Sequence, residues 1–312
     1  SEKDISKRAS LLRTDSVHGI FTGTVKEDFE NKALIINGRT VNMIAAKSPD
    51  TIDYTDYGIQ DALVIDNTGV FRDKEALSLH LKSKGVAKVL LTAPGKGIPN
   101  IVFGVNHKVD VENTSIFSAA SCTTNAITPI LKVVEKQLGV VKGHLETIHA
   151  YTNDQNLVDN MHNKYRRGRA AALNMVITET GAGKAVTKAI PSLEGKLTSS
   201  AIRVPTPNGS LAILNLTLEK ETNLEDINNL MYDAAFDSEL VEQIRFSVNN
   251  ELVSSDIVGD SCSSIYDSPA TQVSNDGKSI VLYIWYDNEY GYTRQVLRLA
   301  KHIAKVRRTC YY

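Results

Sequence analysis

The chain has 312 residues, of which 42% are hydrophobic and 23% are charged; this ordinary globular composition excludes a disordered or fibrous protein. Its 35 basic and 36 acidic residues nearly cancel, so no overall positive charge indicates binding to nucleic acid or to a membrane surface. No apolar run approaches the roughly 18–20 residues that span a bilayer.

The first part of the chain predicts a helix, a hairpin and then alternating strands and helices. Residues 2–13 form a helical pattern, and Asn37-Gly38 favours a tight turn between two apolar runs. The runs 62–65 and 87–91 are continuously apolar, as in buried parallel strands, and a helix is expected between them over 73–84. This alternation predicts an α/β domain with a parallel sheet, whose ligands bind at the carboxyl ends of its strands.

After residue 125 the pattern changes. The apolar face of residues 126–138 predicts a helix. Residues 143–151, 197–205, 211–218 and 279–286 alternate in polarity, which predicts an antiparallel sheet with one covered face. Residues 293–308 form a last helical pattern with basic residues towards its end.

Cys122 is the residue with the clearest reactive chemistry. It precedes a helix expected to start near Thr124, where unpaired N–H groups and the helix dipole favour a thiolate. The alternative is an inert, buried cysteine. His149 ends the following strand, so the fold can return it to Cys122 as an activating base, although a single histidine is more often structural.

Basic and small polar residues suggest anion binding. Arg203 lies in a strand-like segment, where a buried guanidinium needs a carboxylate or phosphate partner. Arg166 lies in a run of arginines, Arg166-Arg167-Gly168-Arg169, which is more typical of a solvated surface than of an anion site. The small residues 180–183 precede a helix, and helix N-termini bind phosphate oxygens.

The cysteine content and the first residues of the chain bear on the cellular compartment. The three cysteines, Cys122, Cys262 and Cys310, are too few and too scattered for a disulfide framework or a zinc site, so we expect no metal and a reduced, cytoplasmic location. The chain starts at Ser1 without the basic and apolar segments of a signal peptide. Because Ser1 is not a methionine, further residues are expected before it.

Several segments, in order along nearly the whole chain, resemble phosphorylating glyceraldehyde-3-phosphate dehydrogenases. They are residues 15–19 (DSVHG), 67–71 (NTGVF), 104–107 (GVNH), 118–125 (SAASCTTN), 149–155 (HAYTNDQ), 180–186 (TGAGKAV), 203–208 (RVPTPN) and 285–292 (WYDNEYGY).

The resemblance implies oxidation of glyceraldehyde 3-phosphate to 1,3-bisphosphoglycerate with NAD, NADP not being excluded, in glycolysis or gluconeogenesis. Cys122 would attack the aldehyde, His149 would take the hydroxyl proton, and inorganic phosphate would cleave the thioester. The implied ligands are Thr152, Arg166 and Arg203 for the substrate phosphate; Ser121, Thr123, Thr180 and Gly181, with Arg203 shared, for inorganic phosphate; and Thr68, Thr92, Asn288 and Tyr292 for the cofactor.

The resemblance also implies the fold and the assembly. We expect a Rossmann-type parallel-sheet cofactor domain over 1–121, an α+β catalytic domain with a mainly antiparallel sheet over 122–288, and a C-terminal helix over 289–312 that returns to the first domain. A homotetramer is implied, with residues 188–208 lining an interface.

Departures from the family pattern leave alternatives open. No G-x-G-x-x-G turn occurs, so we expect the first βαβ unit of the cofactor domain to precede Ser1. Asn160 and Met161 replace a Leu-Pro pair often seen in strictly NAD-dependent members, so the choice between NAD and NADP stays open. The rival functions are erythrose-4-phosphate dehydrogenase, which shares the Cys–His chemistry, and a non-catalytic binding or scaffold protein.

Overall fold

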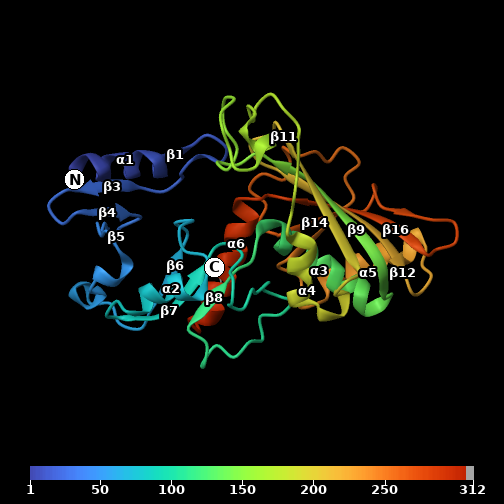
Figure 1. The fold of residues 1–312 in the computed structure, drawn as a ribbon, viewed down its shortest axis with the longest axis horizontal. Helices are drawn as coiled ribbons and strands as arrows, with labels where there is room; N and C mark the ends of the chain where they lie inside the picture. Colours follow the sequence, from blue (N-terminus) through green and yellow to red (C-terminus); the bar gives the residue numbers. More distant parts are fainter. Residues whose placement is uncertain (307–312) are drawn as a thin grey trace.

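The computed structural model describes residues 1–306; Cys310 and the predicted helix end at 308 lie outside the described residues. The chain starts with α1 (Glu2–Arg13), which confirms the predicted first helix. Figure 1 shows α1 over a small antiparallel sheet at one end of the molecule. This sheet consists of β3 (Val25–Asp28), β4 (Ala33–Ile36) and β5 (Arg39–Asn42), and a two-stranded ribbon, β1 (Thr14–Asp15) with β2 (Gly19–Ile20), precedes it.

The β4–β5 hairpin has the predicted tight turn. Asn37 and Gly38 adopt φ angles of 49° and 77°, the left-handed values that a primed hairpin turn requires. One face of the sheet contacts α1 through a small apolar core of Ile5, Ala9 and Leu34.

The predicted parallel sheet is present as β6 (Ala62–Asp66), β7 (Val86–Leu91) and β8 (Ile116–Ser118). The helix between the first two strands, α2 (Lys74–Leu81), is shorter than the predicted 73–84. The residues after α2 form a turn in which Gly85 adopts a φ of 84° and lies too close to the carbonyl of Ile59 for a side chain to fit.

The second sheet has eight strands in the order β10-β11-β9-β12-β16-β14-β13, with β15 paired to β16. The strands are β9 (Val140–Ala150), β10 (Val176–Thr178), β11 (Leu197–Val204), β12 (Ser210–Leu218), β13 (Ile244–Ser247), β14 (Ser264–Asp267), β15 (Gln272–Val273) and β16 (Ser279–Tyr286). The sheet is mainly antiparallel, as predicted, but β9 with β11 and β13 with β14 are parallel.

Three helices cover one face of this sheet (Figure 1). They are α3 (Cys122–Gln137), α4 (Ala182–Ala189) and α5 (Leu224–Phe236). The predicted helix 126–138 therefore begins four residues earlier, because the Ser121 side chain caps it by accepting a hydrogen bond from the N–H of Thr124 at 3.1 Å. Short 3-10 helices occupy Pro49–Thr51, Tyr54–Tyr57, Tyr165–Gly168 and Pro191–Leu193.

The last helix, α6 (Tyr290–Ile303), packs against the parallel sheet. Its apolar residues Val296, Leu299 and Ile303 share a core with Leu90 of β7 and Phe117 of β8. It begins three residues before the predicted 293, because Asp287 accepts the first N–H groups of this turn. None of the helices in residues 1–306 has the length and apolar character to cross a membrane.

Candidate active site

Cys122 and His149 lie together at the junction of α3 and the large sheet. The Cys122 Sγ atom is 3.5 Å from Nε2 of His149. Cys122 is the first residue of α3, and His149 is the penultimate residue of β9. The strand that follows α3 therefore returns to the start of that helix, which is the path that the sequence predicted for this pair.

The backbone before Cys122 is held in an unusual conformation. Ala120 adopts a φ of 56°, a left-handed value that is uncommon for residues other than glycine. Its N–H donates to Ser118 Oγ at 3.0 Å, and its carbonyl accepts a hydrogen bond from the Tyr292 hydroxyl at 2.9 Å. These contacts turn the chain sharply from β8 into α3 and place Cys122 at the helix start.

The His149 ring is fixed from two sides. Its Nδ1 lies 2.7 Å from the carbonyl of Ala150, and this contact holds the ring with Nε2 facing the Cys122 sulfur. The ring packs edge-to-face on Tyr286 at 5.9 Å between centroids, and the Tyr286 hydroxyl bonds to Thr123 Oγ1 at 3.0 Å. His149 is therefore oriented as a base towards the sulfur.

Burial favours the neutral forms of both Cys122 and His149. Burial, followed by the charge of Arg203, lowers the pKa of His149 to about 4. Burial raises the pKa of the Cys122 thiol, although the N–H of Thr123 and the charge of Arg203 act in the opposite direction. The helix start alone was expected to favour a thiolate, but burial outweighs that effect here.

Arg203 connects the base to an anion site. It lies on β11 directly beside His149 in the parallel register with β9. Its Nη1 donates to the carbonyl of Ala150 at 2.8 Å and lies 2.8 Å from His149 Nδ1. Its Nε is buried, without a partner among the described residues. A buried guanidinium with an unused donor fits a phosphate or carboxylate oxygen.

A cavity of about 250 Å³ lies beside these groups. Cys122, His149 and Arg203 line it, and so do the four residues predicted to bind inorganic phosphate, Ser121, Thr123, Thr180 and Gly181. Ala182, the first residue of α4, follows Gly181, so two helix N-termini, those of α3 and α4, meet at the cavity. Helix N-termini favour anions.

Two residues predicted to bind the substrate phosphate lie outside this cavity. Arg166 is exposed and lines a neighbouring groove. Thr152 is half-buried in the loop after β9 and is absent from the cavity lining. Arg167, which the sequence did not single out, is buried, and its charge lowers the pKa of both His149 and Arg203. The sequence run could not distinguish the two arginines, because the short Tyr165–Gly168 helix decides which one turns inward.

Asn288 follows β16 and is held in one orientation. Ser210 Oγ accepts the N–H of Ala150 at 3.1 Å and donates to Asn288 Oδ1 at 2.7 Å. Among residues 1–306 no acceptor is bonded to the Asn288 Nδ2, which remains a donor for a ligand carbonyl such as a carboxamide. Tyr292, one turn into α6, contacts Ala120 next to Cys122.

Thr68 and Thr92 meet at the carboxyl ends of β6 and β7. Thr68 donates through both its N–H and its hydroxyl to Asp66 Oδ1, at 3.0 and 2.9 Å, and Thr92 donates to the carbonyl of Asp66. His80 of α2 bonds to the other carboxylate oxygen of Asp66 at 2.8 Å. The two loops thus form a rigid edge at the place where parallel sheets bind ligands.

Comparison with known proteins agrees with this geometry. Residues 121–288 match the family model described as "Glyceraldehyde 3-phosphate dehydrogenase, C-terminal domain", and residues 2–74 match the model of the NAD binding domain of the same family. The chain belongs to the glyceraldehyde 3-phosphate dehydrogenase family. The matched NAD binding domain identifies the cofactor class as NAD or NADP.

Curated members of the family are similar over almost the whole chain. A glyceraldehyde-3-phosphate dehydrogenase-like protein of Pseudomonas aeruginosa is 55% identical over 98% of this chain, which spans 66% of that relative's length. Glyceraldehyde-3-phosphate dehydrogenase 2 of Synechocystis is 42% identical over 97% of the chain, and the enzyme of Priestia megaterium is 41% identical over 96%; the chain spans 88% of each. These matches confirm the family that the motifs indicated.

Anion binding beside Arg203 is expected to raise the pKa of His149. The positive charge of Arg203 lowers that pKa, and a bound phosphate would cancel part of this charge. The His149 imidazole resonances can be followed by NMR against pH with inorganic phosphate, with chloride at equal ionic strength as the control. Arg203→Leu should remove the response to phosphate. An unchanged or lower pKa with phosphate would contradict an anion site at Arg203.

Proposed function

We propose that this protein oxidises glyceraldehyde 3-phosphate to 1,3-bisphosphoglycerate, using inorganic phosphate and NAD or NADP. One observation carries the proposal: the Cys122 sulfur lies 3.5 Å from Nε2 of His149, and the buried Nε of Arg203, which has no partner among the described residues, belongs to the same cavity. A thiol, a base and an anion site in one cavity are the groups that phosphorylating oxidation of a phosphorylated aldehyde requires.

We assign a residue of the cavity to each step. The Cys122 sulfur would form a bond to the aldehyde carbon while its proton passes to His149 Nε2. The backbone N–H at the start of α3 would stabilise the developing oxyanion, which then takes that proton from His149 and becomes the hydroxyl of the adduct. His149 Nε2 takes the hydroxyl proton of the adduct as the hydride leaves, which produces a thioester on Cys122. An oxygen of inorganic phosphate then attacks the thioester carbon, and the Cys122 sulfur leaves as the thiol.

Phosphate recognition is assigned to two groups of residues. Ser121, Thr123, Thr180 and Gly181 line the cavity and would bind inorganic phosphate. Arg203 would contact either phosphate through its free donor. For the substrate phosphate we retain Thr152 and Arg166 as proposals. Arg166 is exposed, whereas the buried Arg167 is ion-paired with Asp154 and donates to Thr178.

The cofactor proposal uses the residues at the other side of Cys122. A bound nicotinamide would supply the hydride acceptor. The free Nδ2 of Asn288 would bind the carboxamide oxygen, and Tyr292 would lie beside the ring. Thr68 and Thr92 would support the cofactor at the carboxyl edge of the parallel sheet.

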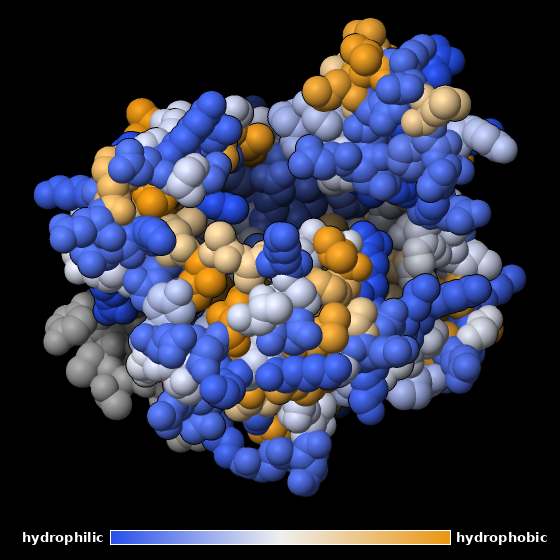
Figure 2. All heavy atoms as spheres, turned by 60° about the vertical axis from the view of Figure 1, so that its left-hand side comes forward, coloured by the Kyte–Doolittle hydropathy of each residue, from blue (hydrophilic) through white to orange (hydrophobic). Residues whose placement is uncertain are grey.

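We also propose a homotetramer, in the cytoplasm, with residues 188–208 among the interface segments. A segment of the chain projects at the top of Figure 1, and Figure 2 shows apolar residues gathered on the projection at its upper right. Met161 is 95% exposed and Tyr165 is 91% exposed, and Leu157, Leu173 and Met175 are exposed nearby. An exposed apolar patch of this kind supports an interaction surface at residues 157–175, whereas the interface at 188–208 is proposed from the family resemblance.

The test is NADH formation by the native, full-length protein with NAD, glyceraldehyde 3-phosphate and inorganic phosphate. We expect formation that requires phosphate and stops when Cys122 is alkylated. NADP and erythrose 4-phosphate are assayed in parallel. Higher kcat/KM with erythrose 4-phosphate would assign the rival activity, and a folded, reduced protein that turns over neither sugar phosphate would favour a non-catalytic role.

A further inference from the structure

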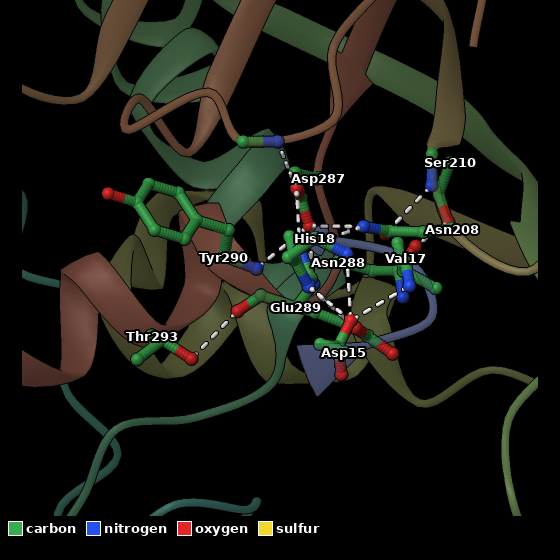
Figure 3. A network of polar contacts seen from close by, with 12 residues as sticks. Asp15, Val17, His18, Asn208, Ser210, Asp287, Asn288, Glu289, Tyr290 and Thr293 are labelled. Carbon is green, nitrogen blue, oxygen red and sulfur yellow. Dashed lines mark hydrogen bonds and ion pairs between the residues drawn. The ribbon is translucent and has the colours of Figure 1, made fainter. Parts of the chain in front are cut away.

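A polar network joins the N-terminal segment to the end of the large sheet (Figure 3). At its centre is His18, in the loop between β1 and β2. The His18 Nδ1 lies 3.3 Å from Asp15 Oδ1 and 3.7 Å from Glu289 Oε2. The His18 Nε2 lies 3.5 Å from Asp287 Oδ2 and 3.4 Å from Asn208 Nδ2. One imidazole thus meets three carboxylates from two distant parts of the chain.

Asp287 is the central acceptor of this network. Its side chain is 0% exposed. It accepts hydrogen bonds from Asn208 Nδ2 at 2.9 Å and from the N–H groups of Gly259, Glu289 and Tyr290 at 2.7 to 2.8 Å. Among residues 1–306, no lysine or arginine forms an ion pair with this carboxylate. These hydrogen bonds compensate the buried carboxylate, and the His18 ring is the side chain whose nitrogen lies 3.5 Å from its other face.

The network extends from Asp287 to the active site. The next residue, Asn288, is bonded to Ser210, which also bonds the N–H of Ala150 next to His149. Asn208, two residues before Ser210, contacts both Asp287 and His18. The segments on either side of Asn288 are therefore fixed by side chains that converge on His18.

We propose that His18 is a positioning residue that holds Asn288 in place through Asp287 and Asn208. This inference rests on the proposed function, in which Asn288 binds the nicotinamide carboxamide. His18 itself does not line the cavity beside Cys122. Its removal should therefore loosen the Asn288 turn and weaken nicotinamide binding, while the Cys122–His149 pair stays intact.

The first readout needs neither cofactor nor turnover. Hydrogen exchange of the amides of Glu289 and Tyr290, both bonded to Asp287, is measured in the native protein and in His18→Ala and His18→Gln. We expect exchange of these amides to become about tenfold faster in His18→Ala. In His18→Gln, a side-chain amide can replace the Nε2 contact, so exchange should stay close to the native rate. Lys84→Ala, which breaks only an exposed ion pair with Asp53, is the control.

The second readout is steady-state kinetics with NAD. We expect the KM for NAD to rise about tenfold in His18→Ala with kcat changed less than about threefold, and His18→Gln to restore most of the difference. Unchanged exchange at Glu289 and Tyr290 in His18→Ala would overturn the proposal, and so would His18→Gln behaving like His18→Ala. Absence of turnover in the native protein would count against the proposed function, while the exchange result would still decide the role of His18.

Discussion

Cys122→Ser is expected to reduce phosphate-dependent NADH formation on the order of 10⁴-fold or more. A serine hydroxyl fits the same position, but it is far less nucleophilic, and His149 is a weak base because burial and Arg203 lower its pKa to about 4. Oxidation by this site therefore depends on sulfur chemistry. The measurement is kcat/KM for glyceraldehyde 3-phosphate, with the pre-steady-state burst of NADH as a second readout.

Cys262→Ser is the matched control for this experiment. Cys262 is half-buried, and burial together with Asp260 raises its pKa to about 11, so it should contribute no nucleophile. Its replacement should leave the kinetics unchanged. The thermal unfolding of Cys122→Ser should stay close to that of the native protein, because the substitution changes a single atom of a side chain at the edge of the apolar core. Retained activity in a folded Cys122→Ser would exclude the thioester route.

Local signals in the sequence predicted much of the fold. Asn37 and Gly38 specify their hairpin turn through backbone conformation, and the continuous apolar runs specify the buried parallel strands. The sequence did not predict which neighbouring strands of the large sheet run parallel. Polarity alternation shows that a strand has one covered face, but it does not show whether its neighbour is parallel, as β11 is to β9.

In the active site, too, local signals were readable from the sequence and contacts between distant residues were not. Cys122 and His149 could be paired from the sequence, because a helix followed by a strand returns the chain to one edge, and Arg203 then lies beside His149 through strand pairing. Arg167 could not be separated from Arg166, since one short helix decides which side chain is buried. The contact of His18 with Asn208 spans 190 positions, and no local pattern encodes it.

His149→Asn is expected to lower kcat for aldehyde oxidation about 10²- to 10⁴-fold, the range typical of a lost general base. Asparagine can keep a donor near the carbonyl of Ala150, so the strand end and its bond with Arg203 should survive. What it lacks is a lone pair at the Nε2 position, 3.5 Å from the sulfur. Proton removal from the adduct then falls to water, which slows the hydride step and therefore the NADH burst.

His144→Asn provides the comparison on the same strand. His144 is also on β9, but its ring forms hydrogen bonds with the hydroxyls of Thr198 and Ser200 of β11. It does not line the cavity beside Cys122. Its replacement should leave the burst unchanged, which separates loss of the base from disturbance of β9. If His149→Asn kept a native burst rate, proton transfer would not pass through Nε2. The 3.5 Å contact with Cys122 would then be structural, and another group in the cavity would have to serve as the base.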